Sequence, residues 1–254
     1  MRGIALNSSI AVIPEIVSVT LRQLLGRRRA ILLLLLATVP ILLAILFRLA
    51  DVHRIGAFTA GIMDAVALTM LLPLVAILFG TAAFGSEIDD GTAVYLLAKP
   101  IGRWAIVLAK LIAAVAVTLI LTVASAGIAG AIALQPYGEE GAEAARGFMA
   151  AMAVGSVCYV TLFMALSLFT RRALVVAIAY WLIWEGLLSS LLAGIANLSV
   201  RQYALGVAGG FYKLSANEAR VAPSTALTLA IVLVVVATVV AIWKLMRFEL
   251  PGGD

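Results

Sequence analysis

The chain offers few side chains that can carry out covalent chemistry. It has one histidine and one cysteine in 254 residues. It contains no G-x-x-x-x-G-K-[ST] phosphate loop, no H-E-x-x-H zinc motif and no G-x-S-x-G nucleophile motif. His53 stands alone in a short polar stretch, and Cys158 stands alone in an apolar one, so hydrolytic and metal-dependent mechanisms lack their parts. The sequence therefore predicts no catalytic residue, no metal site and no cofactor on this chain.

The most distinctive polar segment, residues 86–103, separates two strongly apolar stretches. Acidic residues and a Gly-Thr pair interrupt the preceding helix, a short apolar ridge follows, and a proline ends it. An apolar ridge fits a groove on a partner, and flanking charges orient the contact. We predict a short surface helix that contacts another protein; a structured loop without a partner is the alternative. The candidate contact residues are Glu87, Asp90, Gly91, Thr92, Leu96, Leu97, Pro100, Arg103 and Lys110.

Two acidic residues lie inside apolar stretches. Glu185 is about twelve residues into one stretch, and Asp64 is nearer the end of another. An ionisable side chain at mid-membrane is unfavourable by about 2.5–3.5 kcal/mol on insertion scales, which makes it a functional candidate. Both are therefore candidates for a translocation path. Two alternatives stay open: Glu185 holds helices together or pairs with Arg48, and Asp64 pairs with Arg48 or Arg54.

The composition predicts the elements that position these residues. Apolar residues make up 64% of the chain and charged residues 12%, whereas soluble domains carry about 25% charged residues. The apolar runs are continuous over about 20 residues, which favours helical spans over barrel strands. We predict an all-α polytopic membrane protein in which residues 1–254 form a single transmembrane domain. Its six transmembrane helices cover about 30–50, 59–84, 104–134, 146–170, 173–194 and 222–246, with a kink at Pro73.

Three further segments lie outside these spans. Residues 10–26 have one-sided apolar spacing, which predicts an N-terminal amphipathic helix in the membrane interface, capped at 7–9 with Pro14 in its first turn. A simple extension of the first span is the alternative. Residues 135–147 predict an outer loop. Residues 195–221 are too polar to span and too apolar for a loop, so short outer helices that dip into the membrane are expected.

Basic residues predict the orientation, because they stay on the cytoplasmic side. With the N-terminus inside, twelve basic residues lie inside and six outside. Both termini and segment 86–103 are then cytoplasmic, in a multi-pass protein of the cell inner (plasma) membrane. The net charge of +5 lies at the membrane edge facing anionic lipid, so nucleic-acid binding is not expected. The inside set is Arg2, Arg22, Arg27, Arg28, Arg29, Lys99, Arg103, Lys110, Arg171, Arg172, Lys244 and Arg247; the outside set is Arg48, Arg54, Arg146, Arg201, Lys213 and Arg220.

The order acidic residue, Gly-Thr, Leu-Leu, Pro-x-x-Arg and then Lys on the next span resembles the cytoplasmic coupling-helix region of ABC exporter permeases of the second (ABC-2) type. The flat N-terminal helix, the six spans and the polar stretch before the last span are also similar to that family. The resemblance implies that segment 86–103 contacts an ABC ATP-binding subunit, which carries ATP and Mg. It also implies a dimer with a second copy or a related permease, and no ATPase site on this chain.

The preferred hypothesis is therefore a permease subunit of an ATP-binding cassette exporter, active in efflux. A proton-coupled secondary transporter that uses Glu185 and Asp64 is the main alternative, and it would lose transport in Glu185→Gln without needing ATP. A membrane-embedded enzyme or assembly factor is the third. An enzyme would need a polar catalytic cluster on facing spans, and the sequence shows none.

Overall fold

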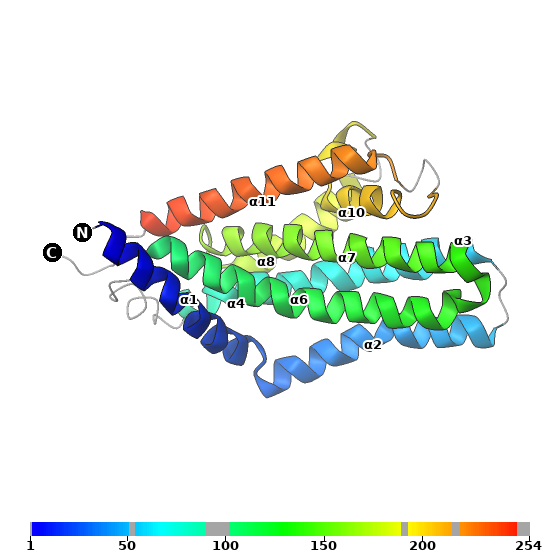
Figure 1. The fold of residues 1–254 in the computed structure, drawn as a ribbon, viewed down its shortest axis with the longest axis horizontal. Coiled ribbons are helices and arrows are strands. Elements are labelled where there is room, and N and C mark those ends of the chain that lie inside the picture. Colours follow the sequence, from blue (N-terminus) through cyan, green and yellow to red (C-terminus); the bar gives the residue numbers. More distant parts are fainter. Residues whose placement is uncertain (1, 51–53, 90–101, 189–192, 215–218, 248–254) are drawn as a thin grey trace.

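The computed structural model describes residues 2–50, 54–89, 102–188, 193–214 and 219–247. Regular structure in these ranges is entirely helical, and they contain no strand. Figure 1 shows long helices lying side by side, with α1 (Arg2–Leu24) inclined to them. The long elements are α2 (Arg27–Leu49), α4 (Leu72–Asp89), α6 (Arg103–Leu134), α7 (Gly138–Ser167) and α11 (Pro223–Met246). The short ones are α3 (Ile55–Phe58), η1 (Thr59–Leu71), η2 (Gln135–Tyr137), α8 (Ala173–Ala179), η3 (Tyr180–Leu188), η4 (Ala193–Leu198) and α10 (Val200–Ala208).

Four helical stretches in the described chain are long and apolar enough to cross a membrane. They are Ile31–Leu49, Ile55–Gly85, Arg103–Ser167 and Pro223–Met246, and Ala173–Leu188 is a shorter apolar helix. The stretch Arg103–Ser167 turns back at η2, so that α6 and α7 lie antiparallel (Figure 1). Helices thus occur within each predicted span, although α7 begins at Gly138 and not near residue 146. Residues 189–192 of the predicted fifth span lie outside the described residues.

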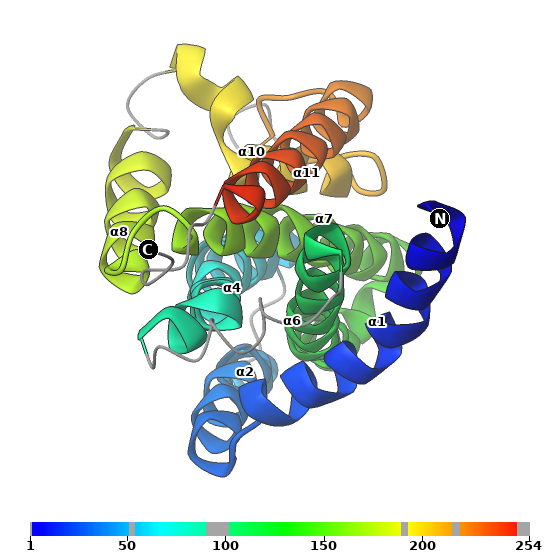
Figure 2. The same cartoon turned by 90° about the vertical axis from the view of Figure 1, so that its left-hand side faces the viewer.

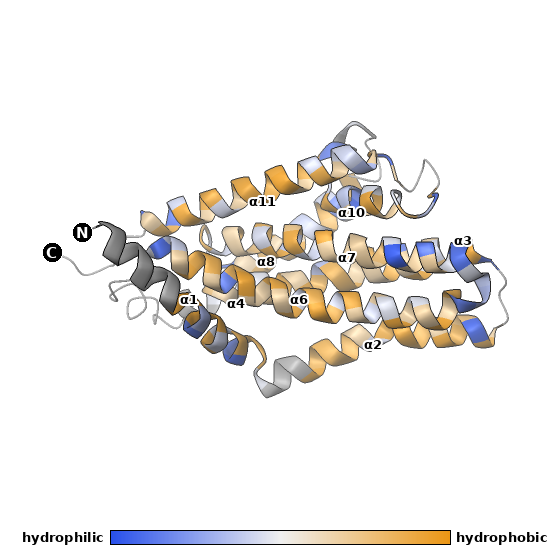
Figure 3. Cartoon of the chain, in the orientation of Figure 1, coloured by the Kyte–Doolittle hydropathy of each residue, from blue (hydrophilic) through white to orange (hydrophobic). Residues whose placement is uncertain are grey.

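The core lies between α4, α6 and α7, seen at the centre of Figure 2 with α2, α8 and α11 around them. In the most apolar part of α2, 22% of the residues are buried, and the same share is buried in α11. In the stretch that contains η1 and α4, the buried share is 61%. The outer helices therefore present apolar side chains outward. In Figure 3, most of the coloured ribbon of α2 and of α11 has the colour of hydrophobic residues. Such a surface suits contact with lipid, because the hydrocarbon core offers no water to apolar side chains.

The N-terminal helix is longer than predicted. It begins at Arg2, so Pro14 lies inside the helix and not in its first turn. The predicted N-cap residues at 7–9 therefore also lie within the helix and do not begin it. Cap residues favour a helix end but do not enforce one. Packing of Thr20 and Leu24, which are buried, holds the later turns against the bundle.

The predicted outer loop 135–147 is wrong. A single 3-10 turn is followed directly by α7, whose first residue Gly138 has a φ of +59°. This left-handed conformation suits glycine. Glu139 and Glu140 lie in the first turn of α7, where the helix dipole favours negative charge. Residues of this Ala- and Glu-rich segment are good helix formers, which explains the extension.

The region before Pro73 is π-helical. η1 has wide turns over Thr59–Leu71, and α-helical geometry resumes at Leu72, one residue before the proline. In an α-helix the Thr69 carbonyl would accept from the N–H of residue 73, and proline has none. The indole N–H of Trp181 donates to this carbonyl at 2.8 Å. The Thr69 carbonyl, to which Pro73 cannot donate a hydrogen bond, thus contacts η3. The predicted kink at Pro73 stays a prediction.

The helix directions sort the basic residues to two ends of the bundle. One end holds the start of α6 and the end of α11, and we call it the Arg103 end. The opposite half holds α10, α3 and the turn between α6 and α7, and we call it the α10 end (Figure 1). Described side chains of the predicted inside set lie at the Arg103 end, and those of the predicted outside set at the α10 end. The first group is Arg22, Arg103, Lys110, Arg171, Arg172, Lys244 and Arg247; the second is Arg48, Arg54, Arg146, Arg201, Lys213 and Arg220.

Candidate functional site

The predicted coupling segment connects the end of α4 to the start of α6. Glu87 lies in the last turn of α4, and α6 begins at Arg103 after Gly102 as N-cap. The other members of the predicted contact set lie outside the described residues; they are Asp90, Gly91, Thr92, Leu96, Leu97 and Pro100. The structure therefore describes how the two ends of the segment are anchored.

Arg103 joins the start of α6 to the end of α11. Its Nη1 atom donates to the carbonyl oxygens of Leu245 and Met246, both at 2.8 Å. These carbonyls belong to the last turn of α11, where helical partners are lacking. A cation is also favoured at the negative end of the helix dipole. Arg103 consequently acts as a C-terminal cap of α11, supplied by another helix.

Lys110 joins α6 to α4. Its side chain is 1% exposed, its Nζ donates to the Ala83 carbonyl at 2.5 Å, and it lies 4.8 Å from the centroid of the Phe84 ring. A buried ammonium group is tolerated only where such partners replace water. Lys110 therefore fixes the last turns of α4 against the first turns of α6.

Aromatic contacts add a third connection at the Arg103 end. Lys244 lies 5.1 Å above the ring of Phe169, in the turn between α7 and α8. Arg247 lies 4.2 Å above the ring of Trp243. Each contact is a cation–π interaction of about 0.5–1 kcal/mol at an exposed site. Lys244 thus connects the end of α11 to the turn between α7 and α8, whereas the contact of Arg247 lies within the end of α11.

Asp64 pairs with Arg201, not with the predicted Arg48 or Arg54. Nε of Arg201 donates to Oδ1 at 3.0 Å, and Nη2 donates to Oδ2 at 2.5 Å. The same Nε lies 2.8 Å from the hydroxyl of Thr69. Arg48 instead donates to the Ile132 carbonyl at 2.7 Å. The bidentate geometry matches the fork of the guanidinium group, which makes this the stronger kind of ion pair.

Glu185 binds the N-terminus of α10. It is 3% exposed, and it accepts from the Ser199 hydroxyl at 2.6 Å and from the Val200 N–H at 2.8 Å. Ser199 is the N-cap of α10, and its oxygen in turn accepts from the Gln202 N–H. A carboxylate at this position satisfies backbone donors that lack helical partners and faces the positive end of the helix dipole.

The two intramembrane acids therefore converge on one short helix. Asp64 comes from η1, Glu185 from η3, and α10 supplies their partners. Close packing supports the same helix: a Cβ at Gly206 would lie 2.6 Å from the Cβ of Ala226 in α11. Small residues at such crossings let helix backbones approach closely. The arrangement anchors α10 to the bundle, and the role of Asp64 and Glu185 in a translocation path stays a prediction.

Sequence reasoning missed the residues that receive these acids. Arg201 was counted as an outer flanking charge, and Ser199, Thr69 and Trp181 were not singled out. One feature of the sequence points to this contact. A basic residue in a half-apolar segment needs a carboxylate partner, and the apolar stretches contain two carboxylates, those of Asp64 and Glu185. Which acid it meets depends on contacts 137 positions apart in sequence.

The described residues contain no group of three or more His, Cys, Asp or Glu side chains that could hold a metal ion. Cys158 is buried, and its sulfur lies 3.9 Å from the Ala230 carbonyl oxygen. The described part of the chain is a bundle of apolar helices. Cationic side chains connect helices at the Arg103 end, and the short helix α10 is held by Asp64 and Glu185 at the other.

This architecture is that of a multi-pass membrane protein. A family model described as ABC-2 family transporter protein matches residues 50–207, more than half of the chain. The chain belongs to this family and is the transmembrane permease of an ABC transporter. Permeases of this family are transport subunits that normally lack an ATPase site of their own and work with an ATP-binding partner. A comparison with curated proteins gave no match.

Proposed function

We propose that this permease belongs to an exporter in which a separate ABC ATPase docks on segment 86–103. The anchoring of the two segment ends supports the proposal most directly. Arg103 connects one end to α11, and Lys110 connects the start of α6 to α4. A displacement of the segment would therefore move three helices together. ATP and Mg²⁺ would be held by the partner, whose closure supplies the displacement.

The orientation follows from charge. The Arg103 end carries the larger set of basic residues, including three consecutive arginines at the start of α2. By the positive-inside rule this end faces the cytoplasm, together with both termini. An ATPase in the cytoplasm then meets segment 86–103. The inner (plasma) membrane is the proposed location.

Six transmembrane spans fit this orientation. They are α2, η1 with α4, α6, α7, α8 with η3, and α11. At 1.5 Å per residue, the 32 residues of α6 measure about 48 Å, which exceeds a hydrocarbon core of about 30 Å. The described part of α8 with η3 covers Ala173–Leu188, and a helix of this length spans where the bilayer thins locally. We assign α1 to the membrane interface.

The transport unit is proposed to hold two permeases and two ATPases. The second permease is a copy of this chain or a related one, as the family resemblance implies. Alternating access would then arise from movement of each group of tied helices relative to the other copy. The contacts of Glu185 with the N-terminus of α10 favour an anchoring role over proton transfer, so no observation favours the proton-coupled alternative.

Co-purification tests the docking site. The tagged permease would be expressed with its own genomic neighbours, isolated in mild detergent, and its partners identified by mass spectrometry. Wild type is expected to retain an ATP-binding chain, whereas Glu87→Lys and Arg103→Glu are expected to lose it and still insert. Arg54→Glu, an exposed arginine at the α10 end, is the matched control and should retain the partner. Unchanged co-purification and transport in both segment variants would refute the proposal.

A further inference from the structure

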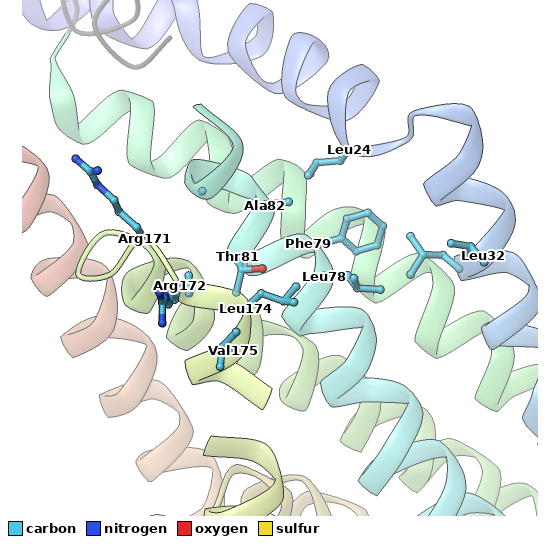
Figure 4. Close-up of a pocket in the computed structure, with 13 residues that line it drawn as sticks. Leu24, Leu32, Leu78, Phe79, Thr81, Ala82, Arg171, Arg172, Leu174 and Val175 are labelled. Carbon is cyan, nitrogen blue, oxygen red and sulfur yellow. The ribbon is translucent and has the colours of Figure 1, made fainter. Parts of the chain in front are cut away.

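A groove at the Arg103 end combines an apolar channel with two exposed arginines. It has a volume of about 410 Å³ and lies between the α1–α2 junction, α4 and the start of α8 (Figure 4). Binding pockets for small ligands occupy about 300–1,000 Å³. The groove is therefore large enough for a small ligand.

The walls of the groove are aliphatic and open outward. Leu33 and Phe79 are buried beneath it, whereas Leu32, Leu78, Leu174 and Val175 are between 42% and 66% exposed. The outer helices α2 and α8 present further exposed aliphatic side chains, among them Leu34, Leu35 and Val176. An occupant can thus enter sideways from a surface suited to lipid.

The rim of the groove is cationic. Arg171 and Arg172, in the turn between α7 and α8, line it and are exposed. No carboxylate of the described residues forms a salt bridge with either guanidinium group. Figure 4 shows both side chains on the α8 side, opposite Leu24 and Leu32. Arginine forms paired hydrogen bonds with phosphate oxygens, so the rim suits a phosphate head group.

Two other cavities among the described residues lack this combination. The groove between α6, α7 and α11 has about 340 Å³ and no charged residue in its lining. The cavity at the α6–α7 hairpin, of about 460 Å³, contains Arg146, which is already paired with Glu139. The first of these cavities has no cation, and the cation of the second already pairs with a carboxylate.

We propose that the groove binds an anionic phospholipid of the bilayer leaflet at the Arg103 end. Its phosphate lies at Arg171 and Arg172, and one acyl chain lies along Leu32, Leu78 and Val175. Lipid tails are as apolar as the groove, so chain burial alone gives little preference for the site over bulk bilayer. Selectivity comes from the head group, since basic pockets between helices attract anionic lipid. The site is independent of the docked ATPase.

Native mass spectrometry of the full chain in detergent tests the site. Phosphatidylglycerol and phosphatidylcholine with identical chains, and inorganic phosphate, would be titrated separately. Wild type is expected to bind phosphatidylglycerol about tenfold more tightly than phosphatidylcholine and to retain no phosphate. Arg171→Ala with Arg172→Ala is expected to abolish the preference, whereas the double lysine variant keeps it.

Two further variants separate the groove from its charge. Gly85 lines the groove, and a Cβ there meets no atom within 4 Å, so Gly85→Leu is designed to extend a side chain into the channel. It is expected to weaken phosphatidylglycerol binding at least fivefold without a change in melting temperature. Arg54→Ala with Lys213→Ala removes two exposed charges at the α10 end and should leave the preference intact.

Three results would overturn the proposal. The first is an unchanged lipid preference in the double alanine variant. The second is binding of inorganic phosphate as tight as that of the lipid, because the acyl chain would then contribute nothing to the affinity. The third is a dimer that excludes lipid in wild type and binds it when dissociated, because a second copy would then occupy the groove.

Discussion

The ion pair between Asp64 and Arg201 should be a major source of stability for the α10 end. The side chains are 9% and 23% exposed, respectively. Removing one partner of a buried pair destabilises a protein by about 3–5 kcal/mol, because the other charge stays buried. Since Arg201 keeps some contact with the exterior, we expect the lower value, about 3 kcal/mol, for Arg201→Ala. For a chain of this size 1 kcal/mol shifts the melting temperature by about 2–4 °C, so a fall of about 6–12 °C follows.

A double-mutant cycle measures the pair itself. Arg201→Ala, Asp64→Ala and the double variant would be melted in the same detergent, with tryptophan fluorescence as the signal. The double variant is expected to fall short of the summed losses by about 2 kcal/mol, since contacting residues couple by about 0.5–3 kcal/mol.

An exposed ion pair provides the control. Arg146 and Glu139 form a salt bridge at 2.6 Å, but their side chains are 54% and 77% exposed. Exposed pairs contribute about 0–1 kcal/mol, so Arg146→Ala should shift the melting temperature by less than about 4 °C. Additive losses from Asp64→Ala and Arg201→Ala, or losses no larger than this control, would refute the reasoning.

Three further variants test other contacts. Glu185→Gln keeps an acceptor for Val200, so we expect a loss of about 1–2 kcal/mol in thermal melts with transport retained; complete loss of transport would favour a proton site. Lys110→Met loses a charged hydrogen bond to α4, worth about 1.5–3 kcal/mol, and should speed hydrogen exchange in the last turns of α4; unchanged exchange would contradict this. Gly138→Ala should destabilise by about 1–2 kcal/mol because of its positive φ, whereas Gly61→Ala, with open space around its Cβ, should not; equal melting temperatures would refute the distinction.

Helix positions were predictable because they depend on local composition. Continuous apolar runs specify helices wherever backbone groups must be satisfied inside lipid. The element bounds at α6 and α11 accordingly differ by one residue from the predicted starts. Helix ends were less predictable. The start of α1 and the helical form of residues 138–147 depend on helix propensity and on packing. The polarity of the residues alone does not predict either.

Tertiary partners were not predictable from one sequence. The sequence singles out the two intramembrane acids, but it does not show that Asp64 meets a residue 137 positions away. That contact exists because η1 and α10 pack together, which is a property of the fold. Conversely, the predicted coupling residues were chosen from spacing and family resemblance, and the described contacts of Arg103 and Lys110 show only how the segment is anchored.

Site-specific photocrosslinking tests the central claim most directly. A photoreactive residue would replace Leu96 in the predicted segment or, as control, Leu198, which is 59% exposed at the α10 end. Irradiation of membranes that contain the intact transporter would be followed by mass spectrometry of crosslinked products. We predict that position 96 captures an ATP-binding subunit and position 198 does not. Capture from position 198 alone, or none from position 96 in actively transporting membranes, would contradict the account.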